Sequence, residues 1–211
     1  MSYPLMEATR VALESVQEVA EYNKAKGHIT GMRDYIFAAR TGSGIEDRAW
    51  LLYRHHSDCV LPVLLQYGQM DKVALDTRVT WVLKKLLEHI GVYPNIADWS
   101  EAMACIRGMA LSGSTALQKV NGLLLLEGIA NEQDLPLLVR LSRDRTLVTW
   151  TSSGKSHAEP LVGFRAVGCI YAVQTEKSRQ ALESICGDAD VDSKVRDYAK
   201  TLLARLSKSQ H

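Results

Sequence analysis

The densest group of potential metal ligands in this sequence lies at residues 53–59. There His55, His56, Asp58 and Cys59 fall within one short segment. A zinc site needs side chains that converge on one point, whereas neighbouring residues on a helix point about 100° apart. We therefore interpret His56 and Asp58 as polar residues at a helix end, and we expect no bound metal.

A second segment has part of a nucleotide-binding motif. Ser153-Gly154-Lys155-Ser156 matches the end of the phosphate-binding loop, but Thr149 stands where that motif requires its first glycine. The strand-to-helix context of the motif is also missing from the pattern. We therefore expect no nucleotide.

The remaining reactive side chains form no recognisable catalytic set. Cys59, Cys105, Cys169 and Cys186 are scattered without a CxxC pair, and no Ser/His/Asp or Cys/His arrangement stands out. We interpret the cysteines as reduced core thiols, with a disulfide frame or a zinc site as the open alternative. We expect no catalytic residue and no cofactor, and therefore a binding protein rather than an enzyme.

A basic stretch with a tryptophan is the strongest candidate for a binding surface. Residues 143–159 separate two helical segments and exceed the about 2–8 residues that usually connect helices in bundles. Thr146–Trp150 favours a strand and Ser153-Gly154 a turn, which indicates a small hairpin or an ordered flap. The open alternative is a mobile insertion whose Trp150 merely covers a groove.

Between residues 140 and 165, five basic residues face only two acidic ones. Arginine and tryptophan are enriched at binding hot spots, and such a surface suits an acidic protein or a phosphate backbone. We predict that six residues contact a partner: Arg140, Arg143, Arg145, Trp150, Lys155 and Arg165.

The elements that must position these residues read as helices. Apolar residues recur at helical spacing over 7–26, from Thr30 or Gly31 through Phe37, and over 46–55, with a clear loop at 41–44. Leu61-Pro62 and Leu135-Pro136 repeat one phrase, and proline costs little in the first turn of a helix.

Four later segments share an apolar position, at Val79, Val120, Phe164 and Val195. Their irregular spacings bracket the about 40–47 residues of HEAT and armadillo units. Leu123–Leu126 is apolar on every side, as expected for a helix that is covered on both faces. The nearby glycines at 122, 128, 163 and 168 indicate close backbone contacts between repeats.

The last unit carries the most specific pattern. Asp192-x-x-Val195-Arg196-x-x-Ala199, followed by Leu202, Leu203 and Leu206, resembles the second helix of a HEAT repeat. The resemblance implies an all-α fold, an α-solenoid or superhelix of stacked antiparallel helical hairpins. It also implies that Asp192 caps its helix and that Arg196 braces a neighbouring repeat. It covers residues 57–206 and implies a fold, not a function.

We expect a single all-α domain over residues 1–211. In it, N-terminal helices occupy 1–56, HEAT-like repeats occupy 57–206, and an insertion lies at 143–159. Lys+Arg 25 against Asp+Glu 24 gives a net charge of +1, which argues against binding to nucleic acid or membrane through bulk charge. The N-terminus lacks the pattern of a signal peptide, and no apolar run reaches the about 18 residues of a membrane helix. These features predict a cytoplasmic protein without a membrane partner.

The fold and charge together predict a non-enzymatic scaffold, adaptor or inhibitor, for example one that neutralises a toxin. Its partner is expected to be a protein held by the concave face and the 143–159 loop. The alternative is a nucleic-acid-binding protein resembling the HEAT-like DNA glycosylases. The two differ in whether basic side chains line the inner helices.

Overall fold

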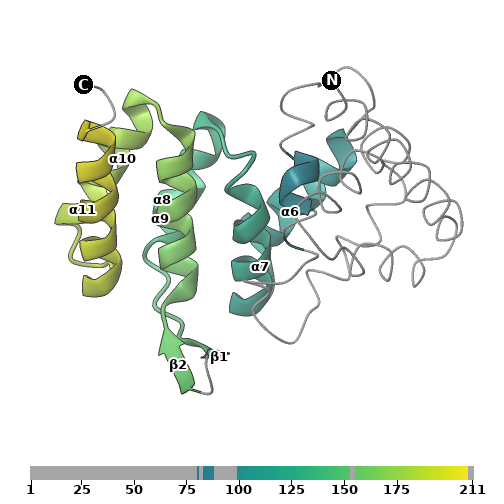
Figure 1. Ribbon diagram of the computed structural model, residues 1–211, viewed down its shortest axis with the longest axis horizontal. Coiled ribbons are helices and arrows are strands. Elements are labelled where there is room, and N and C mark those ends of the chain that lie inside the picture. Colours follow the sequence, from purple (N-terminus) through teal and green to yellow (C-terminus); the bar gives the residue numbers. More distant parts are fainter. Residues whose placement is uncertain (1–79, 81–82, 88–98, 153–154, 209–211) are drawn as a thin grey trace, which may run out of the picture. The chain divides into compact units, whose positions relative to one another are not determined.

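Helices dominate the described part of this computed structural model (Figure 1). The structure describes residue 80 and residues 83–87, 99–152 and 155–208, without the side chains of 150–152, 155 and 207–208. The helices predicted before residue 56 and the ligand cluster at 53–59 lie outside the described residues. The chain divides into two compact units, Met1–Gln66 with Asp76–Ala102, and Tyr67–Leu75 with Met103–His211.

The described elements follow one another as helices with a single two-stranded insertion. They are α6 (Ser100–Ser112), α7 (Ala116–Leu126), the 3-10 turn η1 (Glu132–Asp134), α8 (Leu135–Leu141), β1 (Val148–Ser152), β2 (Lys155–Glu159), α9 (Leu161–Val173), α10 (Glu176–Gly187) and α11 (Ser193–Lys208). Mainly helical structure with little sheet confirms the all-α prediction for this part. None of the described helices has the length and apolarity needed to cross a membrane.

In the second unit the helices form two layers. α7, α9 and α11 lie side by side, and α8 and α10 lie behind them in this view and pack against α9 and each other (Figure 1). The side chains between the layers are buried, among them Leu123–Leu126, Val162, Ala166, Val167, Ile170, Leu182, Ile185, Val195 and Ala199. Each large one stabilises the fold by roughly 1.5–3 kcal/mol. The prediction that Leu123–Leu126 is covered on all sides is confirmed.

Two of the predicted close approaches are present. A Cβ atom at Gly122 would lie 2.4 Å from the backbone nitrogen of Ala110, so only glycine lets α7 meet α6 there. A Cβ at Gly163 would lie 3.0 Å from the carbonyl oxygen of Ser142 and 3.1 Å from Val195. Gly168 is different, because the nearest atom to its Cβ would be a carboxylate oxygen of Glu127 at 4.0 Å.

Side-chain caps begin the helices where the sequence places polar residues. Thr115 accepts a hydrogen bond from the Gln118 amide, and Asp192 accepts one from the Lys194 amide, as the resemblance implies for Asp192. Asn131 forms a reciprocal capping box with Asp134, and Leu135-Pro136 then opens α8. Leu135-Pro136 therefore marks a helix start, after an extra 3-10 turn, whereas Leu61-Pro62 lies outside the described residues.

The insertion is an antiparallel hairpin of two strands, which was one of the two forms predicted for it; the other was an ordered flap. Val148 pairs with Glu159 and Ser152 with Lys155. β1 begins two residues later than predicted, because the Thr146 amide donates to the Asp144 carboxylate and holds that segment in a turn.

The first unit is described only around residues 80–102. Residues 80 and 83–87 are helical, and Thr80, Leu83, Leu86 and Leu87 are buried. Their spacing of three and four residues gives this helix one apolar face, as the helical pattern predicts.

Candidate partner-binding site

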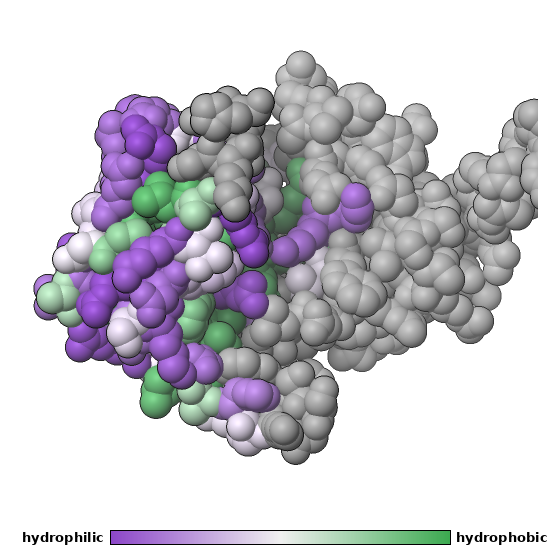
Figure 2. Space-filling view, turned by 60° about the vertical axis from the view of Figure 1, so that its left-hand side comes forward, coloured by the Kyte–Doolittle hydropathy of each residue, from purple (hydrophilic) through white to green (hydrophobic). Residues whose placement is uncertain are grey.

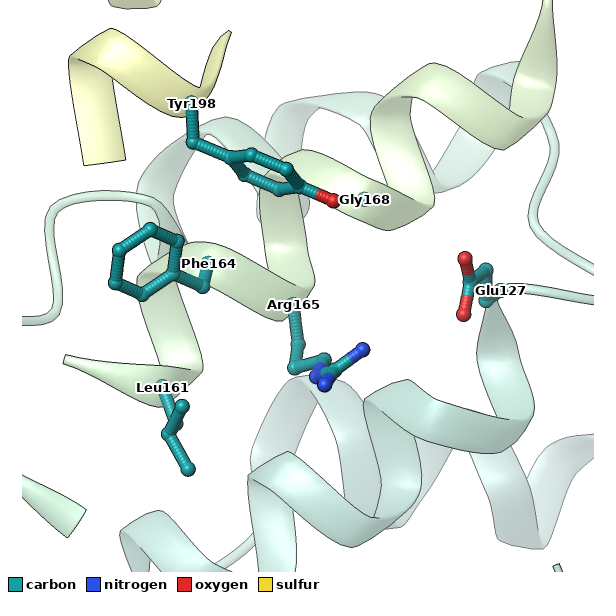
Figure 3. Close-up of a pocket in the computed structure, with 6 residues that line it drawn as sticks. All are labelled: Glu127, Leu161, Phe164, Arg165, Gly168 and Tyr198. Carbon is teal, nitrogen blue, oxygen red and sulfur yellow. The ribbon is translucent and has the colours of Figure 1, made fainter. Parts of the chain in front are cut away.

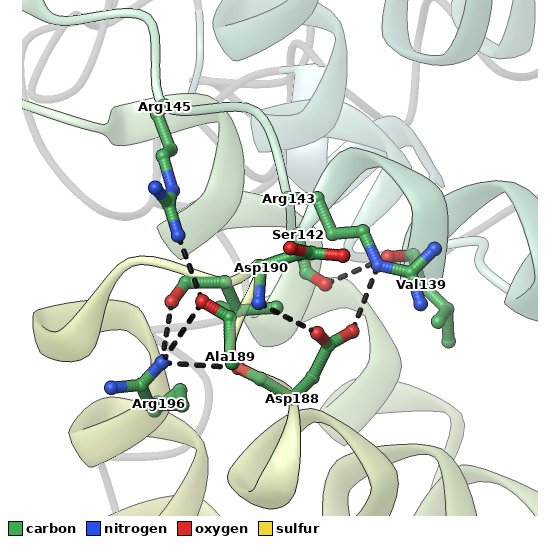
Figure 4. A network of polar contacts seen from close by, with 9 residues as sticks. Val139, Ser142, Arg143, Arg145, Asp188, Ala189, Asp190 and Arg196 are labelled. Carbon is green, nitrogen blue, oxygen red and sulfur yellow. Dashed lines mark hydrogen bonds and ion pairs between the residues drawn. The ribbon is translucent and has the colours of Figure 1, made fainter.

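The base of the hairpin is held by three polar ties. The Arg143 Nε donates to the Asp188 carboxylate at 2.8 Å, and the Arg145 Nη2 donates to the Ala189 carbonyl at 2.9 Å (Figure 4). The Lys119 Nζ lies 3.4 Å from the Asp144 carboxylate. These ties join the segment before β1 to the α10–α11 loop and to α7, so the hairpin grows from a fixed base.

Arg196 acts differently from what the resemblance implies. Its Nη1 donates to the carbonyls of Asp188 and Val191, at 3.1 and 2.8 Å, in the loop that leads into its own helix. Helical side chains lean toward the N-terminus of their helix, so Arg196 in the first turn of α11 reaches back to that loop. The connection from the preceding hairpin is made by Arg145, which meets Arg196 at the Ala189 carbonyl (Figure 4).

Both carboxylates in these ties are held in the charged form. The hydrogen bond from Arg143, and then one from the Asp190 amide, keep the pKa of Asp188 below its ordinary value of 3.8. Burial raises the pKa of Asp144, but hydrogen bonds from Thr146 and the Lys119 charge outweigh it and lower the pKa overall. Both carboxylates are therefore ionised at neutral pH and can pair with their basic partners.

Beyond its base the hairpin presents exposed side chains. Leu147 is 63% exposed and is the one large hydrophobic side chain so exposed in the described part of the chain. Thr149 and Ala158, which pair across the strands, are also exposed, whereas Val148 is buried. Glu159 is tied to α11 by an ion pair with Lys194 at 3.2 Å.

The six predicted contact residues fall into three groups. Arg143 and Arg145 come together at the α10–α11 loop, and Arg140 is exposed on α8. Trp150 and Lys155 lie in β1 and β2, paired with His157 and Ser152, and their side chains are outside the described part. Arg165 lies in α9, in the other helix layer.

Arg165 lines a small pocket on the layer of α7, α9 and α11. The pocket has a volume of about 150 Å³ and is formed by Glu127, Leu161, Phe164, Arg165, Gly168 and Tyr198. In the close-up the Arg165 guanidinium and the Glu127 carboxylate turn toward one another, and the Tyr198 hydroxyl points over Gly168 (Figure 3). Phe164 and Tyr198 pack edge to face with ring centres 5.6 Å apart.

Arg165 differs from the other basic side chains described on this layer. Lys119, Lys194 and Lys200 form ion pairs with acidic residues, and Arg196 donates to carbonyls. The Arg165 Nε is buried and has no hydrogen-bond acceptor among the described residues. A buried N–H group without an acceptor costs about 1–3 kcal/mol, and no described residue offsets this cost for Arg165.

None of the other lining residues was predicted to contact a partner. The sequence indicates Phe164 as an apolar repeat position and Gly168 as a glycine at a close contact, and the helical spacing of Tyr198 favours a packing role. The pocket is lined by the C-cap residue of α7 and by residues of α9 and α11, the three helices of one layer. The spacing of the repeats was therefore the one sequence signal for this pocket. Because the repeat lengths are irregular, the spacing does not predict which residues of the three helices come together.

The thiols of the second unit sit in packing positions. Cys105, Cys169 and Cys186 form no disulfide with one another. Cys169 donates to the Leu123 carbonyl at 3.3 Å, and burial raises the pKa of Cys186. Over residues 83–87, 99–152 and 155–208, no three His, Cys, Asp or Glu side chains gather to hold a metal ion.

No protein family, curated protein or solved structure matches this chain. Its function is therefore inferred from its own residues.

Proposed function

We propose that this chain is a non-enzymatic, cytoplasmic protein-binding module of HEAT-like helical hairpins that acts as an adaptor or inhibitor. Its partner contacts the β1–β2 hairpin and the face of α7, α9 and α11, here called the binding face. Two of the six predicted contact residues, Arg143 and Arg145, support the hairpin from its base, and a third, Arg165, lies on the binding face.

One observation carries this proposal. A two-stranded hairpin is anchored by three polar ties, yet it exposes Leu147 and the Thr149–Ala158 pair. The helix layers bury their core without these exposed positions, so packing does not explain them. A fixed base that presents exposed side chains lowers the ordering cost of binding, which is what a recognition element requires.

The surface favours a protein partner held by polar contacts. On the face shown in Figure 2, hydrophilic side chains cover most of the described surface, and hydrophobic ones form small separate patches. The basic side chains described on α7, α9 and α11 are largely engaged by acidic residues or carbonyls. This pairing weakens the nucleic-acid alternative, which needs free basic side chains along the same face.

The test replaces residues 147–158, which include the exposed Leu147, Thr149 and Ala158, by a short Gly/Ser turn and leaves the base ties in place. Tagged wild-type and shortened proteins are used in quantitative capture from the native host, and the captured partner is then purified and titrated. We expect the shortened protein to melt close to wild type and to bind at least tenfold more weakly. The matched control is Arg179→Gln, which changes an arginine of α10 that pairs with Glu176 and Glu183 of its own helix.

Two outcomes would contradict the proposal. A shortened protein that melts normally and binds its partner unchanged would make the hairpin irrelevant to binding. Retention of nuclease-sensitive nucleic acid, with affinity falling steeply as salt rises, would favour the nucleic-acid alternative.

A further inference from the structure

We propose that the pocket around Arg165 receives one carboxylate side chain, of Asp or Glu, from the protein partner. The inference rests on the proposed protein-binding function and names the chemistry that the binding face recognises.

Arg165 defines what the pocket binds. Its Nε is buried and meets no acceptor among the described residues, although a guanidinium carries five donors in a planar fork. A carboxylate matches this fork, because its two oxygens accept parallel hydrogen bonds from two N–H groups of one guanidinium. It also supplies the opposite charge, which an amide or hydroxyl does not.

The size and walls of the pocket suit the end of one side chain. A volume of about 150 Å³ holds a carboxylate with its methylene groups but not a nucleotide. Leu161 and Phe164 offer apolar contacts for the methylenes, and the Tyr198 hydroxyl adds a polar group to the wall near Gly168 (Figure 3).

Glu127 sets an upper limit to the charge of the ligand. Its carboxylate forms part of the same pocket and points toward Arg165 (Figure 3). Because Glu127 offsets much of the Arg165 charge, the second negative charge of a phosphate monoester gains little attraction in this pocket, while removing it from water costs more than for a carboxylate with one charge. The pocket therefore favours Asp or Glu over a phosphorylated residue.

The direct test uses the ¹⁵N-labelled full chain and two matched probes. N-acetylglutamate N-methylamide presents a single Glu side chain, and the corresponding glutamine compound differs only in charge and acceptor pattern. The Arg165 Nε–H signal is assigned by its loss in Arg165→Gln. We expect the glutamate probe to shift this signal saturably with a Kd in the millimolar range, about that of one small group, and the glutamine probe to bind at least tenfold more weakly.

Equal binding of the two probes, or an Arg165 signal that neither probe moves, would overturn the inference. Tighter binding of inorganic phosphate than of the glutamate probe would overturn the choice of a carboxylate. Arg165→Lys keeps the charge but loses the fork, so we expect about tenfold weaker binding of the glutamate probe.

Filling the pocket gives a second test that leaves Arg165 unchanged. A Cβ atom added at Gly168 would have Glu127 Oε1 as its nearest neighbour, at 4.0 Å. We therefore expect Gly168→Leu to fold and its new side chain to occupy the pocket. Gly108→Leu is the matched control, because a Cβ there meets nothing within 4 Å. Probe binding should be lost only in Gly168→Leu. If that variant melts early, Gly168→Ala replaces it, with a partial loss expected. Unchanged binding in a folded variant contradicts the assignment.

Capture of the partner separates this inference from the proposed function. Weaker capture by Arg165→Gln but not by Arg179→Gln, which changes an arginine of α10 outside the binding face, supports a carboxylate carried by the partner. If the glutamate probe binds but Arg165→Gln captures the partner as well as wild type does, the carboxylate does not come from the partner. The ligand would then be a free carboxylate compound. Probe binding with no captured protein overturns both the partner source and the proposed function.

Discussion

Asp134 is a buried carboxylate that serves two elements. Its side chain caps the turn at Asn131 and forms an ion pair with Arg107 of α6 at 3.0 Å, while it is only 5% exposed. Arg107 also donates to the Ile129 carbonyl at 3.2 Å. One side chain therefore joins α6 to the start of α8.

Replacing Asp134 with alanine should be strongly destabilising. The change leaves Arg107 without its carboxylate and the Asn131 amide without its acceptor, so we expect a loss of about 2–4 kcal/mol in the free energy of unfolding. Urea denaturation would measure it. Asp197→Ala removes the exposed pair with Lys200 and should change the midpoint within error. Similar losses in both variants would show that burial of Asp134 is not the cause.

Two helical glycines should respond in opposite directions to alanine. Gly122→Ala places a methyl group against the Ala110 backbone, so we expect destabilisation of about 1–3 kcal/mol. Gly108→Ala enters open space and should stabilise the protein by about 0.5–1 kcal/mol through helix propensity. Thermal melting measures both. A stabilised Gly122→Ala protein would mean that α6 and α7 do not approach as described.

At the scale of elements, the start of α10 depends on a capping box. The Thr175 hydroxyl accepts from the Ser178 amide, and the buried Ser178 hydroxyl accepts from the Thr175 amide. Thr175→Ala should cost about 1 kcal/mol, and Thr175→Ser should cost much less because it keeps the acceptor. The urea midpoints should fall in that order with an unchanged m-value. Equal losses in the two variants would point to the lost methyl group instead.

For the whole molecule, we expect acid to loosen the second unit. The pKa of Asp188 lies below 3.8 and that of Glu132 below 4.5, in each case mainly because of a hydrogen bond from a basic side chain, Arg143 and Lys177 respectively. A depressed folded-state pKa contributes stability that is complete above the ordinary value and is lost as pH falls through the folded value. The melting temperature should therefore decrease when the pH is lowered below about 4.5.

Asp188→Asn tests the source of this pH dependence. Asparagine keeps the acceptor for the Asp190 amide but loses the charge that pairs with Arg143. Its melting temperature should lie below wild type at pH 7, and the difference should shrink as pH falls below 3.8. Asp190→Asn is the control, because it removes the same charge at an exposed position two residues away. A pH-independent difference for Asp188→Asn would assign its effect to the turn rather than to the ion pair.

Much of the local structure follows from the sequence. Helical periodicity, the capping residues and the Leu-Pro phrase predict the helices of residues 115–208, and Ser153-Gly154 between strand-prone residues predicts the hairpin. These features depend on contacts between near neighbours in the chain, so one sequence is enough to indicate them. The resemblance to HEAT repeats and the division at residue 57 stay predictions.

Tertiary structure alone decided which basic residues are engaged. By composition Arg143, Arg145 and Arg165 are equivalent members of one basic stretch, yet two are tied to a loop about 45 residues away in the chain and one faces a pocket. The sequence does not encode that difference locally, because it depends on how α9 meets α7 and α11. Pairing over such separations is set by the packing of the helix layers, and the candidate site exists only once those layers have formed.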